Sequence, residues 1–383
     1  MDTQKLYYEN PYLAEFEATV LSCSPLGERF EVSLSQTAFY PEGGGQPGDT
    51  GTLGTARVLD TYERDGEILQ LCDAALSVGR AVFGKIDFAR RLDLMQNHSG
   101  EHILSGIVFS RFGFKNVGFH MGAEVITIDF DGEIPESALS GLEREANEAV
   151  WKNIPFKTSA PGAAELKDLF YRSKKELSGE VRIVTCEGYD ACACCGTHVL
   201  RSGEIGLIKI LSCKRLRGGA RLEIVCGARA YEYVNLILAQ NGSTSVLLSA
   251  APEATFAAVR RQFDELCDAR YRLYGFEDAR RSALADSFSG VGEVLLFEPS
   301  MPADDLRRLC ERIFSVCGGD CRVFSGADGE GYKYAIKTTS GEGREEISHM
   351  NDKLSGRGGG RDGFFQGALQ CERTELEAFF ARR

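Results

Sequence analysis

Two short boxes, His98-Ser-Gly-Glu-His102 and Cys194-Cys-Gly-Thr-His198, constrain the fold of this chain more than any other feature of its sequence. They hold three of its five histidines. Residues i and i+4 lie on one face of a helix, so the His98 and His102 imidazoles can converge on one ion. Cys194 and His198, around a glycine-containing turn, complete a set of three nitrogens and one thiolate, which suits tetrahedral zinc. The sequence therefore predicts a Zn2+ site divided between two segments that the fold must bring together.

The thiolate ligand has three candidates. Cys194 is the expected ligand because its spacing to His198 mirrors that of the first box, and Cys192 and Cys195 compete with it. Adjacent side chains point in different directions, so Cys194 and Cys195 are not expected to ligate together. Four protein ligands are typical of a structural zinc, whereas a catalytic zinc keeps one position open. Either one ligand is labile, or the ion orients a substrate without activating water directly.

Composition places the chain among globular intracellular proteins. Its 383 residues predict about two or three domains, and its 43% hydrophobic and 26% charged residues are ordinary for such a fold. The thirteen cysteines are odd in number and scattered, unlike a secreted disulfide framework. The N-terminus lacks a signal peptide pattern, and no apolar stretch approaches the roughly 20 residues that span a bilayer. We expect a cytoplasmic protein without a membrane partner.

Charge favours a local nucleic-acid contact over a general one. The net charge of −12 argues against a surface coated for nonspecific nucleic-acid binding. Solvated surface charge would explain a single basic run, but two runs beside glycine-rich segments favour phosphate contact. The runs contain Lys209, Lys214, Arg215, Arg217 and Arg221, and then Lys353, Arg357 and Arg361.

The first part of the chain, residues 1–90, alternates short β-like runs with Gly, Pro and Asp turns, which predicts a small antiparallel barrel or sandwich. Its most unusual loop, residues 39–51, contains Gly43, Gly44, Gly45 and Gln46. Glycines at this density either punctuate a tight turn or bring backbone amides close to a partner.

Residues 91–228 predict an α+β domain. A helix is expected over 92–112, with Gly113 as its stop signal, and a second helix over 136–153. Strands are expected at 125–130, 181–185, 205–211 and 221–225. The Cys/His box then falls on a loop between strands, where a rigid sheet can aim it at the first helix.

The remaining residues predict a helical arm and a small α/β unit. Residues 229–288 look helical and amphipathic, without a sustained heptad, and are a candidate homodimer contact. From 289 to 383 the pattern predicts a strand, a helix over 306–317, two strands, a short helix near 347–351 and a loop over 356–363.

A metallopeptidase is the first alternative function. His98-x-x-Glu101-His102 also matches the inverted metalloprotease signature, in which the glutamate is the general base. Such enzymes take a third ligand from a later carboxylate, whereas this chain supplies a second Cys/His box. Since Glu101 points about a hundred degrees away from His102 on a helix, it is expected to be solvated or to pair with the helix dipole. His349 lacks a supporting pattern and is interpreted as structural.

Several motifs occur in the order that they have in a known family. They are Gly43–Gly45, Gln96–His102, Phe119–Gly122 with the strand ending at Asp129, Cys194–His198 and Ser202–Gly206. Over roughly residues 30–230 the chain thereby resembles the AlaX-type alanyl-tRNA editing proteins, which are similar to the editing domain of alanyl-tRNA synthetase. Its tail, with Gly356–Arg361 and Gln366-Gly, resembles the DHHA1 domain that ends the synthetase and the long AlaX form.

The resemblance implies a zinc-dependent aminoacyl-tRNA deacylase. It implies zinc bound by His98, His102, Cys194 and His198, and hydrolysis of the ester of alanine-specific tRNA mischarged with serine or glycine. It also implies that the Gly-rich loop borders the tRNA acceptor end and that the DHHA1-like unit holds the tRNA body. One departure is Cys195, which stands where the family usually has glycine.

The full expectation combines these features. The fold class is α+β, with a β-barrel (1–90), a zinc-containing editing domain (91–228), a helical arm (229–288) and a C-terminal α/β DHHA1-like domain (289–383). Oxyanion stabilisation is assigned to hydroxyls such as Thr197 or Ser99, and proton transfer or a pocket wall to His120, which is otherwise structural. A zinc-stabilised RNA-binding module without catalysis is the second alternative. The candidate tRNA contacts are Gly43, Gly44, Gly45, Gln46, Lys214, Arg215, Arg217, Arg357 and Arg361.

Overall fold

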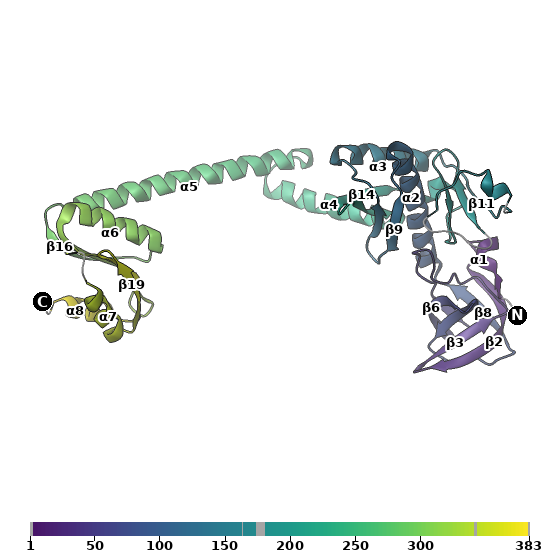
Figure 1. Cartoon of the computed structure of the whole chain (residues 1–383), viewed down its shortest axis with the longest axis horizontal. Coiled ribbons are helices and arrows are strands. Elements are labelled where there is room, and N and C mark those ends of the chain that lie inside the picture. The colour runs from purple at the N-terminus through teal and green to yellow at the C-terminus, as the bar shows by residue number, and fades with distance from the viewer. Residues whose placement is uncertain (1–2, 163, 174–180, 341–342, 382–383) are drawn as a thin grey trace. The chain divides into compact units, whose positions relative to one another are not determined.

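The N-terminal part of the chain closes into an antiparallel barrel with the strand order β2-β3-β7-β6-β5-β8 (Figure 1). Alternating side chains fill its interior, and Val20, Val32 and Leu34 are all buried. The strands are β2 (Glu15–Leu26), β3 (Arg29–Leu34), β5 (Gly51–Leu53), β6 (Ala56–Arg64), β7 (Glu67–Cys72) and β8 (Ala81–Ile86). A barrel is one of the two architectures that the short alternating runs predicted.

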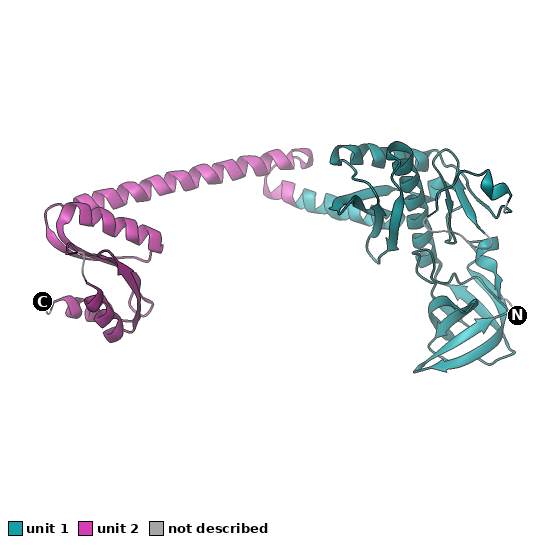
Figure 2. Ribbon diagram, in the orientation of Figure 1, with its two compact units in different colours: residues 1–243 teal, residues 244–383 magenta. Residues whose placement is uncertain are grey.

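This computed structural model describes residues 3–162, 164–173, 181–340 and 343–381. The chain folds as two compact units, residues 1–243 and 244–383 (Figure 2). No helix in the described ranges is both long enough and apolar enough to cross a membrane. Short elements precede and follow the first barrel strands in sequence: β1 (Gln4–Lys5), α1 (Leu6–Glu9) and β4 (Gln36–Thr37).

A long helix, α2 (Phe88–Phe112), carries the first histidine box. The Asp87 side chain caps its first turn by accepting a hydrogen bond from the backbone N–H of Arg90 at 3.2 Å. The helix ends at Gly113, whose φ of 73° is a left-handed conformation that glycine adopts without strain. The predicted stop is confirmed, and the helix begins four residues earlier than the apolar spacing indicated because the cap lies upstream of that pattern.

Two antiparallel sheets complete the α+β part of the first unit. One has the order β14-β15-β10-β9 and the other β11-β12-β13. The second box lies on the loop that follows β13, next to α2, as predicted. The bounds are β9 (Asn116–Met121), β10 (Ile126–Phe130), α3 (Glu136–Trp151), β11 (Phe156–Ser159), η1 (Glu165–Lys167), β12 (Ile183–Cys186), β13 (Asp190–Ala193), η2 (Ser202–Ile205), β14 (Ile208–Leu216) and β15 (Gly219–Cys226).

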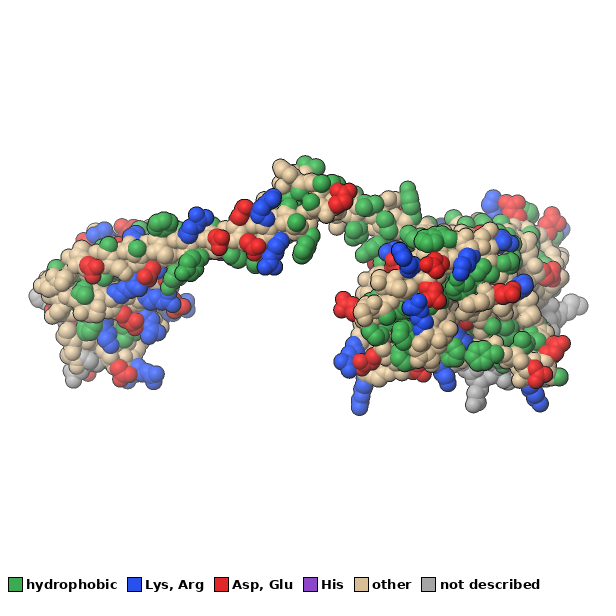
Figure 3. Space-filling view, turned by 90° about the horizontal axis from the view of Figure 1, so that it is seen from above, with side chains coloured by type: hydrophobic (Ala, Val, Ile, Leu, Met, Phe, Trp, Pro, Cys, Tyr) green, Lys and Arg blue, Asp and Glu red, His purple; other side chains and the backbone are tan. Residues whose placement is uncertain are grey.

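The predicted helical arm is two helices, α4 (Gly227–Leu247) and α5 (Thr255–Asp286), separated by the short helix η3 (Pro252–Ala254). The boundary between the compact units falls inside α4. Hydrophobic side chains stand on the surface of α5 (Figure 3), and Phe256 and Phe263 are 83% and 58% exposed.

The second unit is built on a five-stranded sheet with the order β16-β17-β18-β20-β19. One expectation was wrong: residues 356–361 are not a loop but the edge strand β19. Glycine is a poor strand former, yet a Cβ on Gly358 would lie 2.4 Å from the Gln366 carbonyl oxygen, so only glycine permits this close pairing. The bounds are β16 (Gly292–Glu298), α6 (Ala303–Cys317), β17 (Gly318–Ala327), β18 (Gly331–Lys337), α7 (Arg344–Lys353), β19 (Gly356–Arg361), β20 (Phe364–Leu369) and α8 (Arg373–Phe380).

Candidate metal centre

The four predicted ligands converge in the first unit. His98 and His102 project from α2, and Cys194 and His198 come from the loop after β13. One ligand atom from each lies within 4.8 Å of all the others. The Cys194 Sγ is 3.4 Å from Nε2 of His98 and 3.4 Å from Nε2 of His198. The three imidazoles are almost completely buried, so this arrangement is a built site rather than a surface coincidence.

Each imidazole is held through its outward nitrogen. Nδ1 of His98 lies 2.9 Å from the Gln46 Oε1. Nδ1 of His102 lies 3.1 Å from an Asp190 carboxylate oxygen. These contacts leave the Nε2 atoms turned toward the Cys194 sulfur. Ligand histidines in metalloproteins are oriented in the same way, by an acceptor on the nitrogen that does not bind the ion.

The third imidazole is held by a hydroxyl. Nδ1 of His198 lies 3.1 Å from the Ser99 Oγ, which also accepts a hydrogen bond from the Val199 N–H at 3.1 Å. Ser99 is fully buried. Its hydroxyl therefore orients His198, and the expected direct role of Ser99 in oxyanion stabilisation stays a prediction.

Gln46 joins the Gly-rich loop to the metal site. Its Oε1 accepts a hydrogen bond from the Thr197 N–H at 3.0 Å, and its Nε2 donates to the Thr197 Oγ1 at 2.8 Å. Both side chains are buried. Both side chains thus help to fix the second box beside His98, and the tRNA contact of Gln46 and the oxyanion contact of Thr197 stay predictions.

Neighbouring charges set the protonation states of the ligands. Burial opposes ionisation of the Cys194 thiol, but the His98 and His102 imidazoles outweigh it and hold the pKa of Cys194 well below its usual value. Burial also opposes charge on His102, yet Cys194 and Asp190 hold the pKa of His102 well above its usual value. Burial, together with the other two imidazoles, lowers the pKa of His198. A divalent cation requires the thiolate and three neutral imidazoles, so the lowered pKa values of Cys194 and His198 favour its binding, whereas His102 must release its proton.

The other two candidate thiolates lie outside the four-residue cluster. The Cys195 side chain is exposed, and its Sγ lies 3.6 Å from the Tyr40 hydroxyl. Cys192 is buried, and burial raises the pKa of its thiol, which disfavours the thiolate. Within the described residues, Cys192 groups with His102 and Asp190 but not with the other histidines. The donor set of Cys194 and three imidazoles fits zinc, because it combines one soft and three borderline ligands.

A cleft of about 1060 Å³ opens onto the site. His98, His102 and Cys194 line it together with Gly44, Gly45 and Phe119. The Phe119 ring stacks on the His98 imidazole, with centroids 5.1 Å apart. A Cβ on Gly45, whose φ is +88°, would lie 2.7 Å from Phe119, so this approach of the Gly-rich loop requires glycine.

One further predicted residue, His120, does not reach the cleft. His120 follows Phe119 on β9 and is exposed, and it is not among the described residues that line the cleft. Successive strand residues point to opposite faces, so the same register that puts Phe119 on His98 turns His120 away, and its expected role in proton transfer is corrected.

Glu101 is buried rather than solvated, in contrast to the expectation. Its Oε1 accepts hydrogen bonds from Ser105 at 2.7 Å and Asn116 at 2.5 Å, and its Oε2 lies 3.9 Å from Nε2 of His102. Glu101 is absent from the described lining of the cleft. A general base must reach the water or substrate that it deprotonates, so this position disfavours the peptidase alternative.

The first basic run is largely paired with carboxylates. Lys214 pairs with Glu223, and Arg215 lies 2.6 Å from Glu133. Arg217 is exposed beside them. These residues follow or end β14, and none of them lines the cleft. The sheet places carboxylates opposite these cations, which the sequence did not indicate. Both pairs lie at the surface, where ion pairs are weak, so Lys214 and Arg215 remain candidates for phosphate contact.

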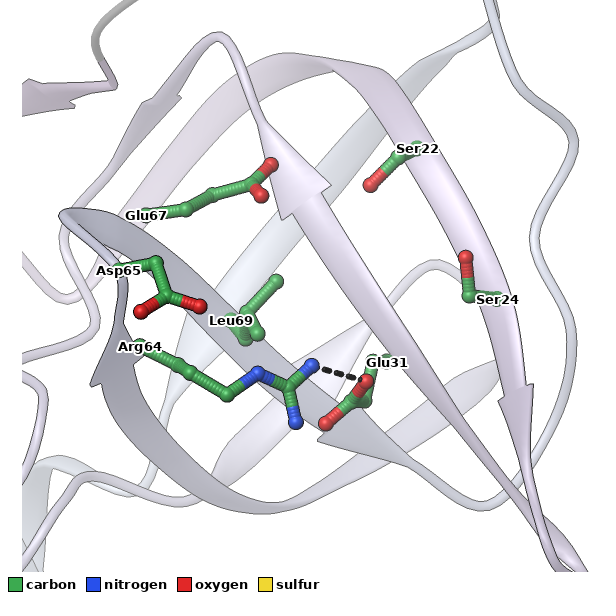
Figure 4. Close-up of a pocket in the computed structure, with 7 residues that line it drawn as sticks. All are labelled: Ser22, Ser24, Glu31, Arg64, Asp65, Glu67 and Leu69. Carbon is green, nitrogen blue, oxygen red and sulfur yellow. Dashed lines mark hydrogen bonds and ion pairs between the residues drawn. The ribbon is translucent and has the colours of Figure 1, made fainter.

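A second, smaller pocket lies on the barrel (Figure 4). It has a volume of about 230 Å³, and an ion pair of 2.5 Å joins Arg64 to Glu31 within it. Three carboxylates line it, so it is unsuited to an anionic ligand. Its lining consists of Ser22, Ser24, Glu31, Arg64, Asp65, Glu67 and Leu69.

Sequence reasoning missed Asp190, which lies four positions before Cys194 and also binds Arg172 at 2.6 Å. We expect Asp190→Ala to weaken zinc binding by about 10- to 100-fold, because His102 loses the acceptor that orients it. Competition with a chelating dye measures this affinity. The control is Glu187→Ala, which removes an exposed carboxylate three residues before Asp190. This variant should bind zinc as the unmodified chain does. Equal affinities of the two variants would contradict an orienting role for Asp190.

Comparison with known proteins relates the chain to alanyl-tRNA editing proteins. Residues 181–222 match the family described as threonyl and alanyl tRNA synthetase second additional domain. The chain is 26% identical to the alanyl-tRNA editing protein AlaX-L of Pyrococcus horikoshii over 97% of its length and 96% of that protein. It is 30% identical to the alanyl-tRNA editing protein Aarsd1 of Danio rerio, over 65% of this chain and 64% of that protein.

The same comparison relates the chain to part of a larger enzyme. It is 36% identical to the alanine–tRNA ligase of Natronomonas pharaonis over 76% of its length, and it spans 33% of that ligase. The near full-length match to AlaX-L covers both compact units. The chain is therefore similar to the AlaX-type alanyl-tRNA editing proteins over nearly its whole length, and to one region of the alanine–tRNA ligases.

Proposed function

We propose that this protein is a zinc-dependent hydrolase that removes serine or glycine from mischarged alanine-specific tRNA in the cytoplasm. The observation that carries the proposal is the convergence of His98, His102, Cys194 and His198 beside an open cleft bordered by a glycine loop. A synthetase pocket built for alanine cannot strongly reject a residue that differs by one methylene or one hydroxyl, so a second hydrolytic sieve is required.

The proposed chemistry needs little beyond orientation and charge stabilisation. When bound, Zn2+ supplies a Lewis acid at the ester. Gln46, Ser99 and Asp190 hold the three imidazoles in fixed orientations. Gly44 and Gly45 line the cleft without side chains, which leaves space for the acceptor end. An aminoacyl ester is more reactive than a peptide, so such preorganisation suffices.

We assign the tRNA body to the second unit, whose sequence resembles a DHHA1 domain. Arg357 and Arg361 lie on the edge strand β19, and both side chains are exposed. An edge strand with small residues lets a nucleic-acid backbone approach closely. We therefore propose that residues 91–228 bind the aminoacyl ester of the tRNA and that residues 289–383 bind the body of the tRNA.

We also propose a homodimer through α5. Its exposed residues Phe256, Val259, Phe263 and Leu266 recur at three- and four-residue spacing, as in paired helices, and Leu273 follows after seven. A second copy presents the same stripe. The stripe contains Phe256, Val259, Phe263, Leu266 and Leu273. Phe263→Asp is expected to shift the protein from dimer to monomer in sedimentation velocity, whereas Arg261→Ala, an exposed polar change on α5, leaves it dimeric. A monomeric unmodified chain at micromolar concentration would refute the dimer.

The direct test of function is incubation of zinc-loaded protein with seryl-, glycyl- and alanyl-tRNA for alanine. Seryl- and glycyl-tRNA should lose their amino acids, whereas alanyl-tRNA is spared. If zinc-loaded protein leaves the hydrolysis rate of seryl-tRNA at its uncatalysed value, the proposal is wrong. Binding with steep salt dependence and no turnover would instead indicate the RNA-binding module. Cleavage of a peptide that is lost in Glu101→Gln would indicate the peptidase.

A further inference from the structure

The cleft beside the metal centre carries cationic side chains but no acidic ones. Lys5 and Arg182 line it, and no Asp or Glu occurs among its described lining residues. The chain as a whole has a net charge of −12, so this separation of charge departs from the average surface. A cleft of one sign concentrates ligands of the opposite sign. The cleft is thus suited to an anion, in contrast to the carboxylate-lined pocket on the barrel.

Neighbouring groups do not neutralise the charge of Lys5 or Arg182. The Lys5 Nζ lies 3.6 Å from Glu63, and both side chains are more than 40% exposed, which makes this pair weak. Arg182 donates from Nη1 to the carbonyl oxygens of Cys194 and Gly196 at 2.9 and 2.8 Å. These acceptors are neutral, so they fix the guanidinium without cancelling its charge. Arg182 is also bonded directly to the loop that carries the metal ligand.

An aromatic ring lies against this guanidinium. The Tyr8 ring centroid is 4.9 Å from Cζ of Arg182, and Tyr8 lines the cleft with 37% of its surface exposed. Tyr7 packs edge-on against Tyr8 at 4.6 Å, and Tyr40 packs against Tyr7 at 5.4 Å. Tyr7 and Tyr40 are almost fully buried. Tyr8 is therefore the exposed end of an anchored aromatic row and has little freedom to move when a ligand binds.

We propose that Tyr8 and Arg182 form the platform on which the 3′-terminal adenine of the charged tRNA stacks, with Lys5 contacting the adjoining phosphate. This inference rests on the hydrolase function proposed above. An aromatic ring and a guanidinium plane are the surfaces on which proteins stack single-stranded bases. The hydrogen bonds from Arg182 to the Cys194 loop connect the platform to the metal ligands, so a stacked base has a fixed position relative to the ester.

The test is the binding of a stable amide analogue, 3′-deoxy-3′-(L-serylamino)adenosine 5′-phosphate, to the zinc-loaded full chain by calorimetry. Tyr8→Ala is expected to weaken its binding by about 5- to 150-fold, the range for loss of one base stack. Tyr8→Phe retains the ring and should bind as the unmodified chain does. Lys5→Ala should weaken binding of the phosphorylated analogue but not that of the analogue with a free 5′-hydroxyl.

An abasic form of the analogue is the matched control. It should bind the unmodified chain and Tyr8→Ala with equal, low affinity, because neither can stack a missing base. Zinc content and circular dichroism establish that Tyr8→Ala is folded. Equal affinity of Tyr8→Ala and the unmodified chain for the adenosine analogue overturns the platform and leaves the hydrolase standing. Absence of binding to the zinc-loaded, unmodified chain overturns both.

Discussion

Cys194→Ala should lose zinc and at least about 100-fold of its seryl-tRNA deacylation rate, while the first unit stays folded. Removing an outer residue that orients a ligand already costs about 10- to 100-fold, and Cys194 itself supplies the thiolate within 3.4 Å of two imidazoles. Cys194 belongs to neither buried core and only packs against the margin of the core around α2, so its truncation to alanine removes little of that core. Metal analysis, circular dichroism and a deacylation assay measure the three quantities.

Cys195→Gly is the matched control for that experiment. It changes the neighbouring residue to the glycine that the family usually has, and the Cys195 sulfur faces Tyr40 rather than the histidines. We expect this variant to retain zinc and activity. Loss of zinc in Cys195→Gly with retention in Cys194→Ala would reverse the ligand assignment. Unfolding of Cys194→Ala on loss of zinc would make the ion structural.

Arg91→Met should destabilise the first unit by about 3–5 kcal/mol, the cost of leaving one charge of a buried pair without its partner. Arg91 and Asp49 are 0% and 1% exposed. The Arg91 Nε donates to Asp49 at 2.9 Å, and its Nη2 donates to the Ala38 carbonyl at 2.7 Å. These bonds join α2 to the end of the Gly-rich loop. Urea unfolding followed by fluorescence of Trp151, the single tryptophan, reports on this unit.

The double variant Asp49→Asn/Arg91→Met is the control. Its asparagine can still accept the hydrogen bond that the Tyr40 N–H donates to Asp49 at 2.6 Å, but it carries no charge. It should be more stable than Arg91→Met alone, because no uncompensated charge remains buried. If the single and double variants unfold at the same urea concentration, the loss arises from packing rather than from the charge on Asp49.

Local sequence patterns were sufficient to predict the four candidate metal ligands and most of the helices and strands around them. The i, i+4 spacing puts His98 and His102 on the same face of any helix, whatever its surroundings. Gly113 ends that helix because glycine adopts a left-handed conformation without strain. The glycines of residues 356–361 predict a loop because local propensity disfavours a strand there, and only the close approach of β20 explains why they form β19.

Contacts between distant segments could not be predicted from the sequence. Nothing near Gln46, Ser99 or Asp190 indicates that each orients a different imidazole, and the carboxylates that pair with Lys214 and Arg215 are identified only by sheet register. The sequence by itself indicated a zinc-type donor set and a resemblance to the alanyl-tRNA editing proteins. The tertiary structure groups Cys194, rather than Cys192 or Cys195, with the three histidines, and His120 is absent from the described lining of the cleft. Those answers depend on which way side chains point across a sheet and a loop, and that direction is set by long-range packing.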